Sequence, residues 1–102
     1  MSHRDVFVVS TARTAIGTFG GSLKDVPNTQ LATTAVKAAI ARSGLAPDAV
    51  GHVVMGNVIP TDTKDAYLSR VAAIDAGCPI ETPAFNVNRL CGSGLQAIIS
   101  AA

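Results

Sequence analysis

Blocks of hydrophobic and polar residues along the chain predict a strand followed by a helix. Val6–Val9 is continuously apolar and rich in β-branched residues, which is typical of a central strand buried on both faces. A long polar, glycine-rich connection follows. Apolar residues then recur at helical spacing from a predicted cap at Asn28 to Ser43, where Gly44 supplies a stop.

The same order of elements is repeated further along the chain. A second strand is predicted over 50–55 and ends at Gly56, and a second helix over 68–76 ends at Gly77. Residues 83–87 alternate apolar and polar side chains with a period of two, which predicts a third strand.

A last helical stripe runs to the end of the chain. It consists of apolar residues at helical spacing, namely Leu95, Ile98, Ile99 and Ala102. Because strands alternate with helices, we predict an α/β fold with a mainly parallel sheet and helices on its faces. No stop signal follows the stripe, so we expect residues 1–102 to be part of a domain cut inside this helix.

Composition and charge narrow the classes of function. The 102 residues suffice for one modest domain, and eight Lys and Arg against seven Asp and Glu leave a formal charge of +1 without a basic cluster. We therefore expect no nucleic-acid partner. The apolar runs are too short for a bilayer and no leader-like segment precedes Val6, so we expect no membrane partner and a cytoplasmic location. In that reducing compartment the two cysteines should remain thiols.

The residues best suited to catalysis or ligand binding surround Cys91, between a predicted strand and a predicted helix. Open α/β sheets bind ligands at that position, and free helix amides there favour the thiolate. Gly92 and Gly94 leave room for a large substrate group and permit unusual turn angles, and Ser93 can pair with free helix amides. The backbone amide of Cys91 is a candidate oxyanion donor. From these residues alone, a nucleophile and a small buried thiol both remain open.

The other candidate residues are expected to be structural. His52 adjoins a predicted strand, His3 is expected to be solvated at a loose terminus, and Cys78 is a structural or exposed thiol. Arg13 is expected to form a structural ion pair. Glycines within 17–21 lack the spacing of a phosphate-binding loop and indicate a flexible connection.

Three blocks of the chain resemble the thiolase family. Asn88–Ile98 is similar to the active-site signature of thiolases, and Cys91 falls on the cysteine that becomes acylated in that family. The opening Val8–Thr14 with Phe19–Leu23, and the later Gly51–Val58, resemble the family's amino-terminal block and second strand. The resemblance extends over essentially all of the chain, in order and spacing.

This resemblance implies a thiolase-like layered fold in which residues 1–102 form a partial amino-terminal domain. It implies an acyl-CoA acyltransferase that condenses two acetyl-CoA to acetoacetyl-CoA, or cleaves short β-ketoacyl-CoA, through an acyl-Cys91 intermediate. It also implies a homo-oligomer, a dimer of dimers, that needs no metal or redox cofactor because proton transfers suffice. The family's catalytic histidine and second cysteine lie in motifs absent from this chain, so we expect the fragment alone to be inactive.

Other interpretations of the residues and of the resemblance remain. Gly92 is more like the biosynthetic, acetoacetyl-CoA type, whereas Asp65–Arg70 looks closer to bacterial β-ketothiolases, which leaves the acyl chain length open. A β-ketoacyl carrier protein synthase shares the fold and the role of the cysteine. A non-catalytic, thiolase-like interaction fragment is the alternative from another functional class.

Overall fold

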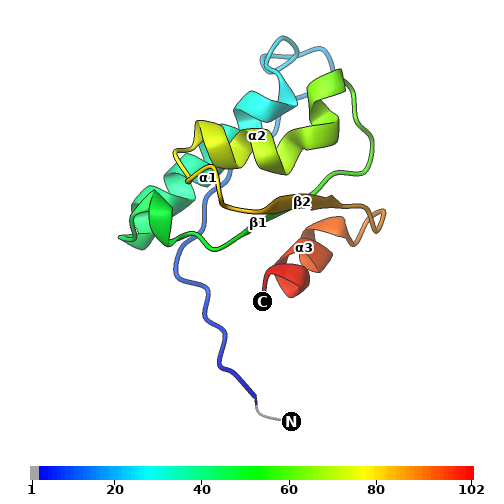
Figure 1. Cartoon of the computed structure of the whole chain (residues 1–102). Helices are drawn as coiled ribbons and strands as arrows, with labels where there is room; N and C mark the ends of the chain where they lie inside the picture. The colour runs from blue at the N-terminus through cyan, green and yellow to red at the C-terminus, as the bar shows by residue number, and fades with distance from the viewer. Residues whose placement is uncertain (1–2) are drawn as a thin grey trace.

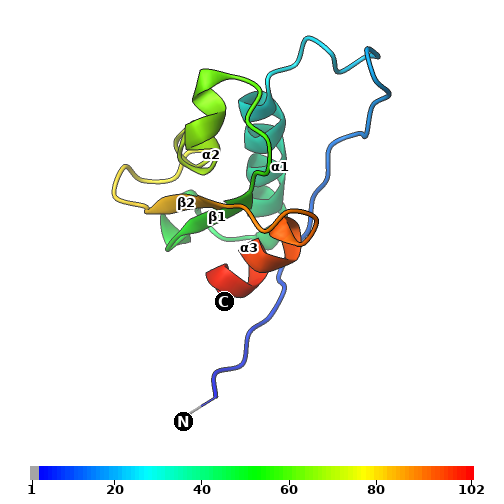
Figure 2. The same cartoon turned by 90° about the vertical axis from the view of Figure 1, so that its right-hand side faces the viewer.

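The structure, a computed structural model that describes residues 3–102, is built in three layers. Helices α1 (Asn28–Ser43) and α2 (Leu68–Asp75) lie side by side on one face of a small sheet. Helix α3 (Ser93–Ala101) lies on the opposite face, as Figure 1 and the rotated view in Figure 2 show. A short 3-10 turn, η1 (Pro47–Ala49), follows α1.

The sheet has two parallel strands, β1 (Val53–Gly56) and β2 (Ala84–Val87). The connection between them runs through a 3-10 turn, η2 (Thr63–Tyr67), and then α2. At the end of the pairing Gly56 lies opposite Val87, so the carboxyl ends of both strands meet at one edge. Parallel pairing with helices on both faces confirms the predicted α/β class.

The helix ends follow local signals in the sequence. Gly44 ends α1 with φ 75° and Gly77 follows α2 with φ 97°, left-handed angles that glycine adopts without steric cost. The predicted cap was wrong by one residue, because Pro27 holds the cap position and Asn28 is the first helical residue. The Asn28 amide donates instead to the carboxylate of Asp65, at 2.9 Å.

Small side chains make up most of the core and allow the layers to approach closely. One cluster joins α1 to α2, with Met55 of β1 packed against it, and its buried members are Ala32, Leu68 and Ala72. The other joins α2 to β1 and the turn after α2, and its buried members are Val53, Ala73 and Cys78. Ala72 and Ala73 are completely buried, so a larger side chain at either position would separate neighbouring layers.

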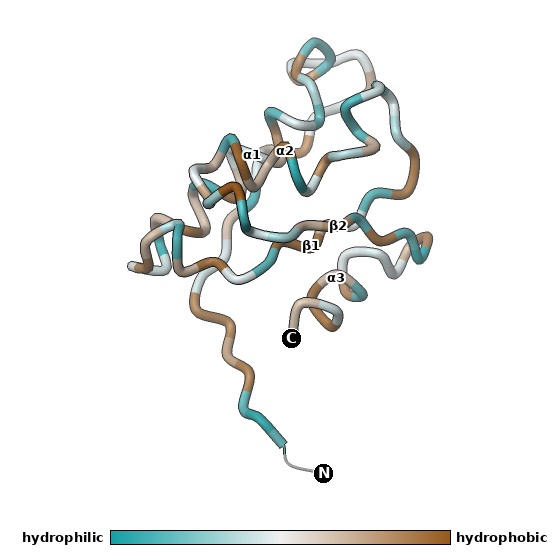
Figure 3. The backbone as a smooth tube through the Cα atoms, viewed as in Figure 1, coloured by the Kyte–Doolittle hydropathy of each residue, from teal (hydrophilic) through white to brown (hydrophobic). Residues whose placement is uncertain are grey.

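The predicted first strand is not formed. Val6–Val9 is extended but unpaired, with exposures of 63–78%, and Figure 3 shows this apolar stretch leading away from the folded layers. Hydrogen bonds from Ser10 to the Ala39 carbonyl and from Arg42 to the Thr11 carbonyl attach the following residues to α1. A strand that is apolar on both faces requires neighbouring strands and two covering layers. Residues 3–102 do not supply them to this segment.

The apolar stripe of the last helix is exposed rather than packed against the sheet. Leu95, Ile98 and Ile99 are 62%, 63% and 55% exposed, whereas the small residues Ser93 and Ala97 are buried. Helix α3 approaches the end of β1 so closely that only small side chains fit between them. Its apolar stripe therefore faces away from the sheet.

Candidate functional site

The Cys91 turn, residues 88–92, connects the end of β2 to the start of α3. Cys91 is exposed and directly precedes Gly92, the residue at the cap position of α3. The structure therefore places this thiol at the predicted strand-to-helix junction, near the edge where both strands end. This is the edge at which open α/β sheets bind ligands.

Leu90 gives the turn its unusual shape. Its φ of 48° makes it the one residue other than glycine in 3–102 with a positive φ. For a leucine this is a strained conformation that persists only when surrounding contacts enforce it. The unusual angle was expected at a glycine, but Gly92 has an ordinary φ of −92°.

The buried hydroxyl of Ser93 closes the turn from inside. Its Oγ accepts a hydrogen bond from the Arg89 N–H at 2.7 Å and donates one to the Leu90 carbonyl at 2.7 Å. The residue is 4% exposed. Ser93 thus pairs with groups that precede the helix, rather than with free helix amides as the sequence suggested.

Asn88 holds the same turn from outside. Its Oδ1 accepts the Leu90 N–H at 3.0 Å, a local side-chain turn, and its Nδ2 donates to the Val58 carbonyl at 3.3 Å. Leu90 is consequently bound at its N–H by Asn88 and at its carbonyl by Ser93. The second bond of Asn88 joins the turn to the segment that follows β1.

The Cys91 N–H is one of two backbone donors of the turn that find no acceptor within residues 3–102, the other being the Asn88 N–H. The Gly92 N–H donates to the Arg89 carbonyl and the Ser93 N–H to the Leu90 carbonyl. The Cys91 N–H has no acceptor within the part of the chain that the structure describes. It is therefore available as a hydrogen-bond donor, and its role as an oxyanion donor stays a prediction.

Glycines allow close approach on both sides of the Cys91 turn. A Cβ on Gly56 would lie 2.9 Å from the Ser93 carbonyl carbon and 3.1 Å from the Gly94 nitrogen, so α3 begins directly against β1. A Cβ on Gly94 would meet no atom within 4 Å. The space beside Gly94 is therefore open, as predicted. A Cβ on Gly92 would instead lie 3.5–3.9 Å from Arg89, so the predicted room is found at Gly94 alone.

The second thiol has the opposite environment. Cys78 is 6% exposed and packs against Val53 and Ala73, and burial raises the pKa of its thiol. Both cysteines are free. The structural interpretation of Cys78 is confirmed.

The remaining candidate residues are exposed or make structural contacts. His52 is exposed and its ring packs at 5.4 Å, tilted by 55°, against Phe85. His3 is exposed. The Arg13 guanidinium donates to the Thr14 carbonyl at 2.8 Å, so the expected ion pair with a carboxylate is not formed. Arg70 donates to two carbonyls of the connection between α2 and β2.

Asp65, which organises the segment between β1 and α2, was not among the site residues predicted from the sequence. It is 1% exposed, and its Oδ2 accepts from the Thr61 N–H, the Thr61 hydroxyl, the Asn28 amide and the Asp62 N–H at 2.8–3.1 Å. These bonds, the Thr61 N–H first, lower the pKa of Asp65. The spacing of Asp62 and Asp65 is that of a capping box and was the available signal.

Asp65 also connects to the strand ends through its backbone. Its carbonyl accepts the side-chain amides of Asn57 at 2.7 Å and Asn86 at 3.3 Å. The Oδ1 of Asn86 in turn accepts the Ser69 N–H. This N–H lies in the first turn of α2, where backbone N–H groups have no partner within the helix. The segment after β1 is thus held in two ways. Asn57 in this segment donates to the Asp65 carbonyl, and Asn88 of the Cys91 turn donates to the Val58 carbonyl.

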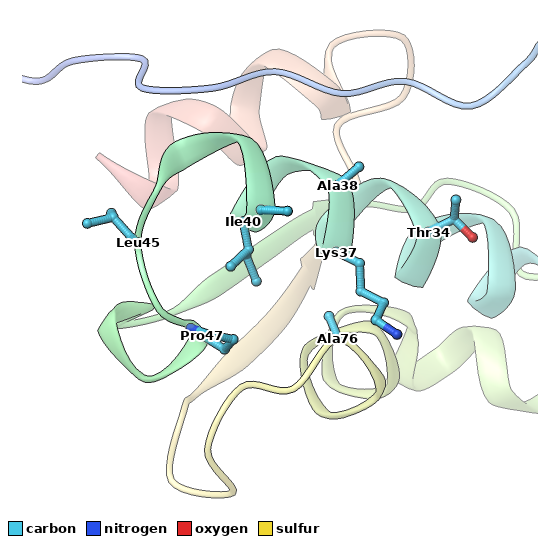
Figure 4. Close-up of a pocket in the computed structure, with 8 residues that line it drawn as sticks. Thr34, Lys37, Ala38, Ile40, Leu45, Pro47 and Ala76 are labelled. Atoms are coloured by element: carbon cyan, nitrogen blue, oxygen red, sulfur yellow. The ribbon is translucent and has the colours of Figure 1, made fainter.

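An open hollow lies elsewhere, against α1. It has a volume of about 610 Å³ and is lined mainly by apolar side chains, with Lys37 as its charged residue (Figure 4). Ile40, Leu45, Pro47 and Ala76 form much of its wall. Cys91 does not line it, so this hollow adds nothing to the chemistry of the thiol.

Two other kinds of feature are absent from residues 3–102. No group of three or more His, Cys, Asp or Glu side chains is arranged to hold a metal ion. No helix in the same range combines the length and the apolar character needed to cross a membrane.

Comparison with known sequences gives a consistent result. Residues 6–102 match the family model described as thiolase, N-terminal domain. The chain is 62% identical over 99 residues to beta-ketothiolase BktB of Cupriavidus necator, covering 97% of this chain and 25% of that protein. It is 45% identical over 97 residues to human mitochondrial 3-ketoacyl-CoA thiolase, covering 95% and 24%. The chain thus spans about a quarter of the length of these relatives.

Solved structures agree with the sequence comparison. Human mitochondrial 3-ketoacyl-CoA thiolase in complex with CoA superimposes with a TM-score of 0.89 at 45% identity, over 92% of this chain and 24% of that one. Acat5 thiolase from Ascaris suum in complex with coenzyme A gives 0.87 at 30% identity, over 97% and 26%.

Proposed function

Because the chain belongs to the thiolase family, we propose that Cys91 is the acyl-accepting nucleophile of an enzyme that transfers acetyl or short acyl groups between CoA thioesters. One observation carries the proposal: an exposed thiol stands beside an unpaired N–H at a strained turn where two parallel strands end. Names of relatives support the substrate class, since they specify 3-ketoacyl-CoA and acetyl-CoA.

The first half-reaction uses the groups of the Cys91 turn. The Cys91 thiolate attacks the thioester carbonyl carbon, and the oxygen takes up negative charge within reach of the free Cys91 N–H. When the carbonyl re-forms, the bond to CoA sulfur breaks. CoA leaves as a thiolate that takes up a proton, and the acyl group stays on Cys91.

The second half-reaction returns the cysteine to its starting state. A second acetyl-CoA loses an α-proton to a base, and its carbon attacks the acyl carbon on Cys91. The sulfur–carbon bond breaks, releasing a β-ketoacyl-CoA and the thiolate. The reverse sequence is thiolytic cleavage, and we propose that no metal or redox cofactor takes part, since proton transfers suffice.

The proton-transfer groups are proposed to come from outside residues 3–102. His52 packs against Phe85, and Cys78 is buried with a raised pKa, so neither is a suitable partner for Cys91. We therefore infer that residues 1–102 alone do not turn over. The complete enzyme, proposed to be a homo-oligomer, supplies the base and the second acid.

Trapping the acyl-enzyme tests this proposal. Acid quenching of the complete enzyme with acetyl-CoA, followed by peptide mass spectrometry, is expected to find the acetyl group on the peptide containing Cys91. Cys91→Ala should lower turnover by at least ~1000-fold, as loss of a nucleophile does. Cys78→Ala is the matched control and should keep turnover within about threefold, since a buried free thiol acts as a small hydrophobe.

The outcomes separate the competing functions. Acylation of Cys91 only when an acyl carrier protein presents the group would favour a β-ketoacyl carrier protein synthase. Full turnover by Cys91→Ala, or no acylation of Cys91 from either donor, would refute the nucleophile and leave the interaction fragment as the better interpretation.

A further inference from the structure

We infer that Ser93 and Asn88 are positioning residues for Cys91, an inference that rests on the proposed function. Neither side chain is bonded to the thiol itself. Each binds Leu90, the residue immediately before Cys91. Their role is to impose the Leu90 backbone angle, which sets the directions of the Cys91 thiol and of its free N–H.

The direction of the Cys91 backbone depends on the residue before it. The torsions of Leu90 decide where the next N–H and Cβ point. Leucine adopts a positive φ of 48° only when neighbouring groups compensate its strain. Relaxation to a negative φ would rotate both the thiol and the Cys91 N–H away from their present positions.

The contacts that compensate the strain of Leu90 are few and specific. Asn88 Oδ1 binds the Leu90 N–H at 3.0 Å, and Ser93 Oγ binds the Leu90 carbonyl at 2.7 Å. Ser93 Oγ also accepts the Arg89 N–H at 2.7 Å, so one buried hydroxyl satisfies backbone groups on both sides of the Arg89–Leu90 peptide. Without it, the Arg89 N–H loses its acceptor, and the Leu90 carbonyl keeps only the hydrogen bond from the Ser93 N–H.

Ser93 differs in its contacts from Ser100, the other serine of α3. Ser100 lies on the same helix, and its hydroxyl accepts from the Gln96 side chain at 3.1 Å. It makes no contact with the Cys91 turn through that bond. Ser100→Ala therefore removes the same hydroxyl from the same helix without touching Leu90.

The experiment compares steady-state kinetics of the complete enzyme and its variants with acetyl-CoA. Ser93→Ala is expected to lower kcat by roughly 10- to 100-fold while KM changes by less than about threefold, because misplaced reacting atoms slow chemistry more than binding. Ser100→Ala should stay within about twofold in both constants, as expected for a site without contact to the reaction.

Asn88 variants provide a test that does not depend on a buried site. Asn88 is exposed, so Asn88→Ala does not disturb the core, and it should lower kcat by roughly 5- to 10-fold at nearly constant KM. Asn88→Ser should recover part of this loss, because a serine hydroxyl can accept the N–H two residues on.

The possible failures are distinguishable. If the wild type and Ser100→Ala transfer acyl groups and both Ser93→Ala and Asn88→Ala keep kcat within about twofold, the positioning role is overturned and the nucleophile stands. If Ser93→Ala does not fold, Asn88→Ala decides by the same criterion. If the wild type itself forms no acyl-Cys91, the proposed function fails and this inference fails with it.

Discussion

Asp65 is a buried carboxylate whose charge is balanced by hydrogen bonds rather than by a cation. Four donors converge on its Oδ2, from Thr61, Asn28 and Asp62. They favour the ionised form and hold the pKa below its ordinary value of 3.8, with the Thr61 N–H as the largest cause. The stability that this charge contributes is therefore present above pH 3.8 and is lost as the pH falls through the lowered pKa.

We accordingly predict an acid-dependent contribution of Asp65 to folding. Asp65→Asn should unfold at lower denaturant concentration than the wild type at neutral pH, and the difference should shrink once the pH falls below 3.8. Urea titrations between about pH 3 and 7 measure it. Asp25→Asn, at an exposed position, is the matched control and should parallel the wild type. A constant gap between Asp65→Asn and the wild type at every pH would contradict the prediction.

The individual site residues differ in how visible they are in the sequence. Cys91 stands out because glycines and a serine surround it at a strand-to-helix junction. Nothing about leucine signals that Leu90 adopts a left-handed angle, because that angle results from two hydrogen bonds to neighbouring side chains. Asp65 escaped attention because its donors include Asn28, 37 positions away.

The contact between β1 and α3 determines where the Cys91 turn lies. Gly56 ends β1 against the backbone of Ser93 and Gly94, with no room for a Cβ. The small residues of α3 face this contact, and its larger apolar residues face outward. Strand and helix therefore form one rigid support for the thiol.

We predict that Gly56→Ala disturbs both stability and the reactive turn. The added Cβ would lie 2.9 Å from a backbone carbon, so α3 must move, at a cost of about 1–3 kcal/mol of unfolding free energy by comparison with overpacked cores. Alkylation of Cys91 by iodoacetamide should change in rate as well. Gly51→Ala is the control, because a Cβ there meets nothing within 4 Å.

Unfolding curves and alkylation rates check this prediction together. Gly51→Ala is expected to match the wild type within about 0.5 kcal/mol, as surface substitutions usually do. A Gly56→Ala protein that is equally stable and equally reactive would show that β1 and α3 do not depend on their close approach.

Element boundaries were largely predictable because their signals are local. The stop signals Gly44 and Gly77 adopt left-handed angles where the sequence pattern ends the helices. β2 lies within its predicted stretch and α3 coincides closely with its own, whereas β1 begins at Val53 rather than at residue 50. The failure at Val6–Val9 has a different origin, because a strand exists only through partners that its own sequence does not contain.

The folded layers leave two apolar surfaces open. One is the extended Val6–Val9, and the other is the outward stripe of α3. The segments that carry them lie at the lower side of Figure 1, in the blue and red parts of the chain. Contiguous exposed apolar surface of this kind favours binding of hydrophobic molecules.

We expect the 102-residue chain on its own to bind the dye ANS. Replacing Leu95 and Ile98 with serine should reduce the fluorescence increase, because these two side chains are 62% and 63% exposed. A control with Gln30→Ser and Thr63→Ser, two exposed uncharged positions that do not line the hollow against α1, should leave it unchanged. Equal dye binding by both double variants would show that the α3 stripe is not accessible in solution.

The sequence by itself determined the α/β class, the helices with their glycine ends and the two strands, and it singled out Cys91 as the candidate nucleophile. These depend on periodicity and turn residues, which act over a few neighbouring positions. Only the tertiary structure decided which face of α3 is buried, that Val6–Val9 is unpaired, that Leu90 is strained and that Asp65 is an anchor. Each of these depends on groups brought together by folding, such as Gly56 against Ser93, and the local sequence carries no record of such contacts.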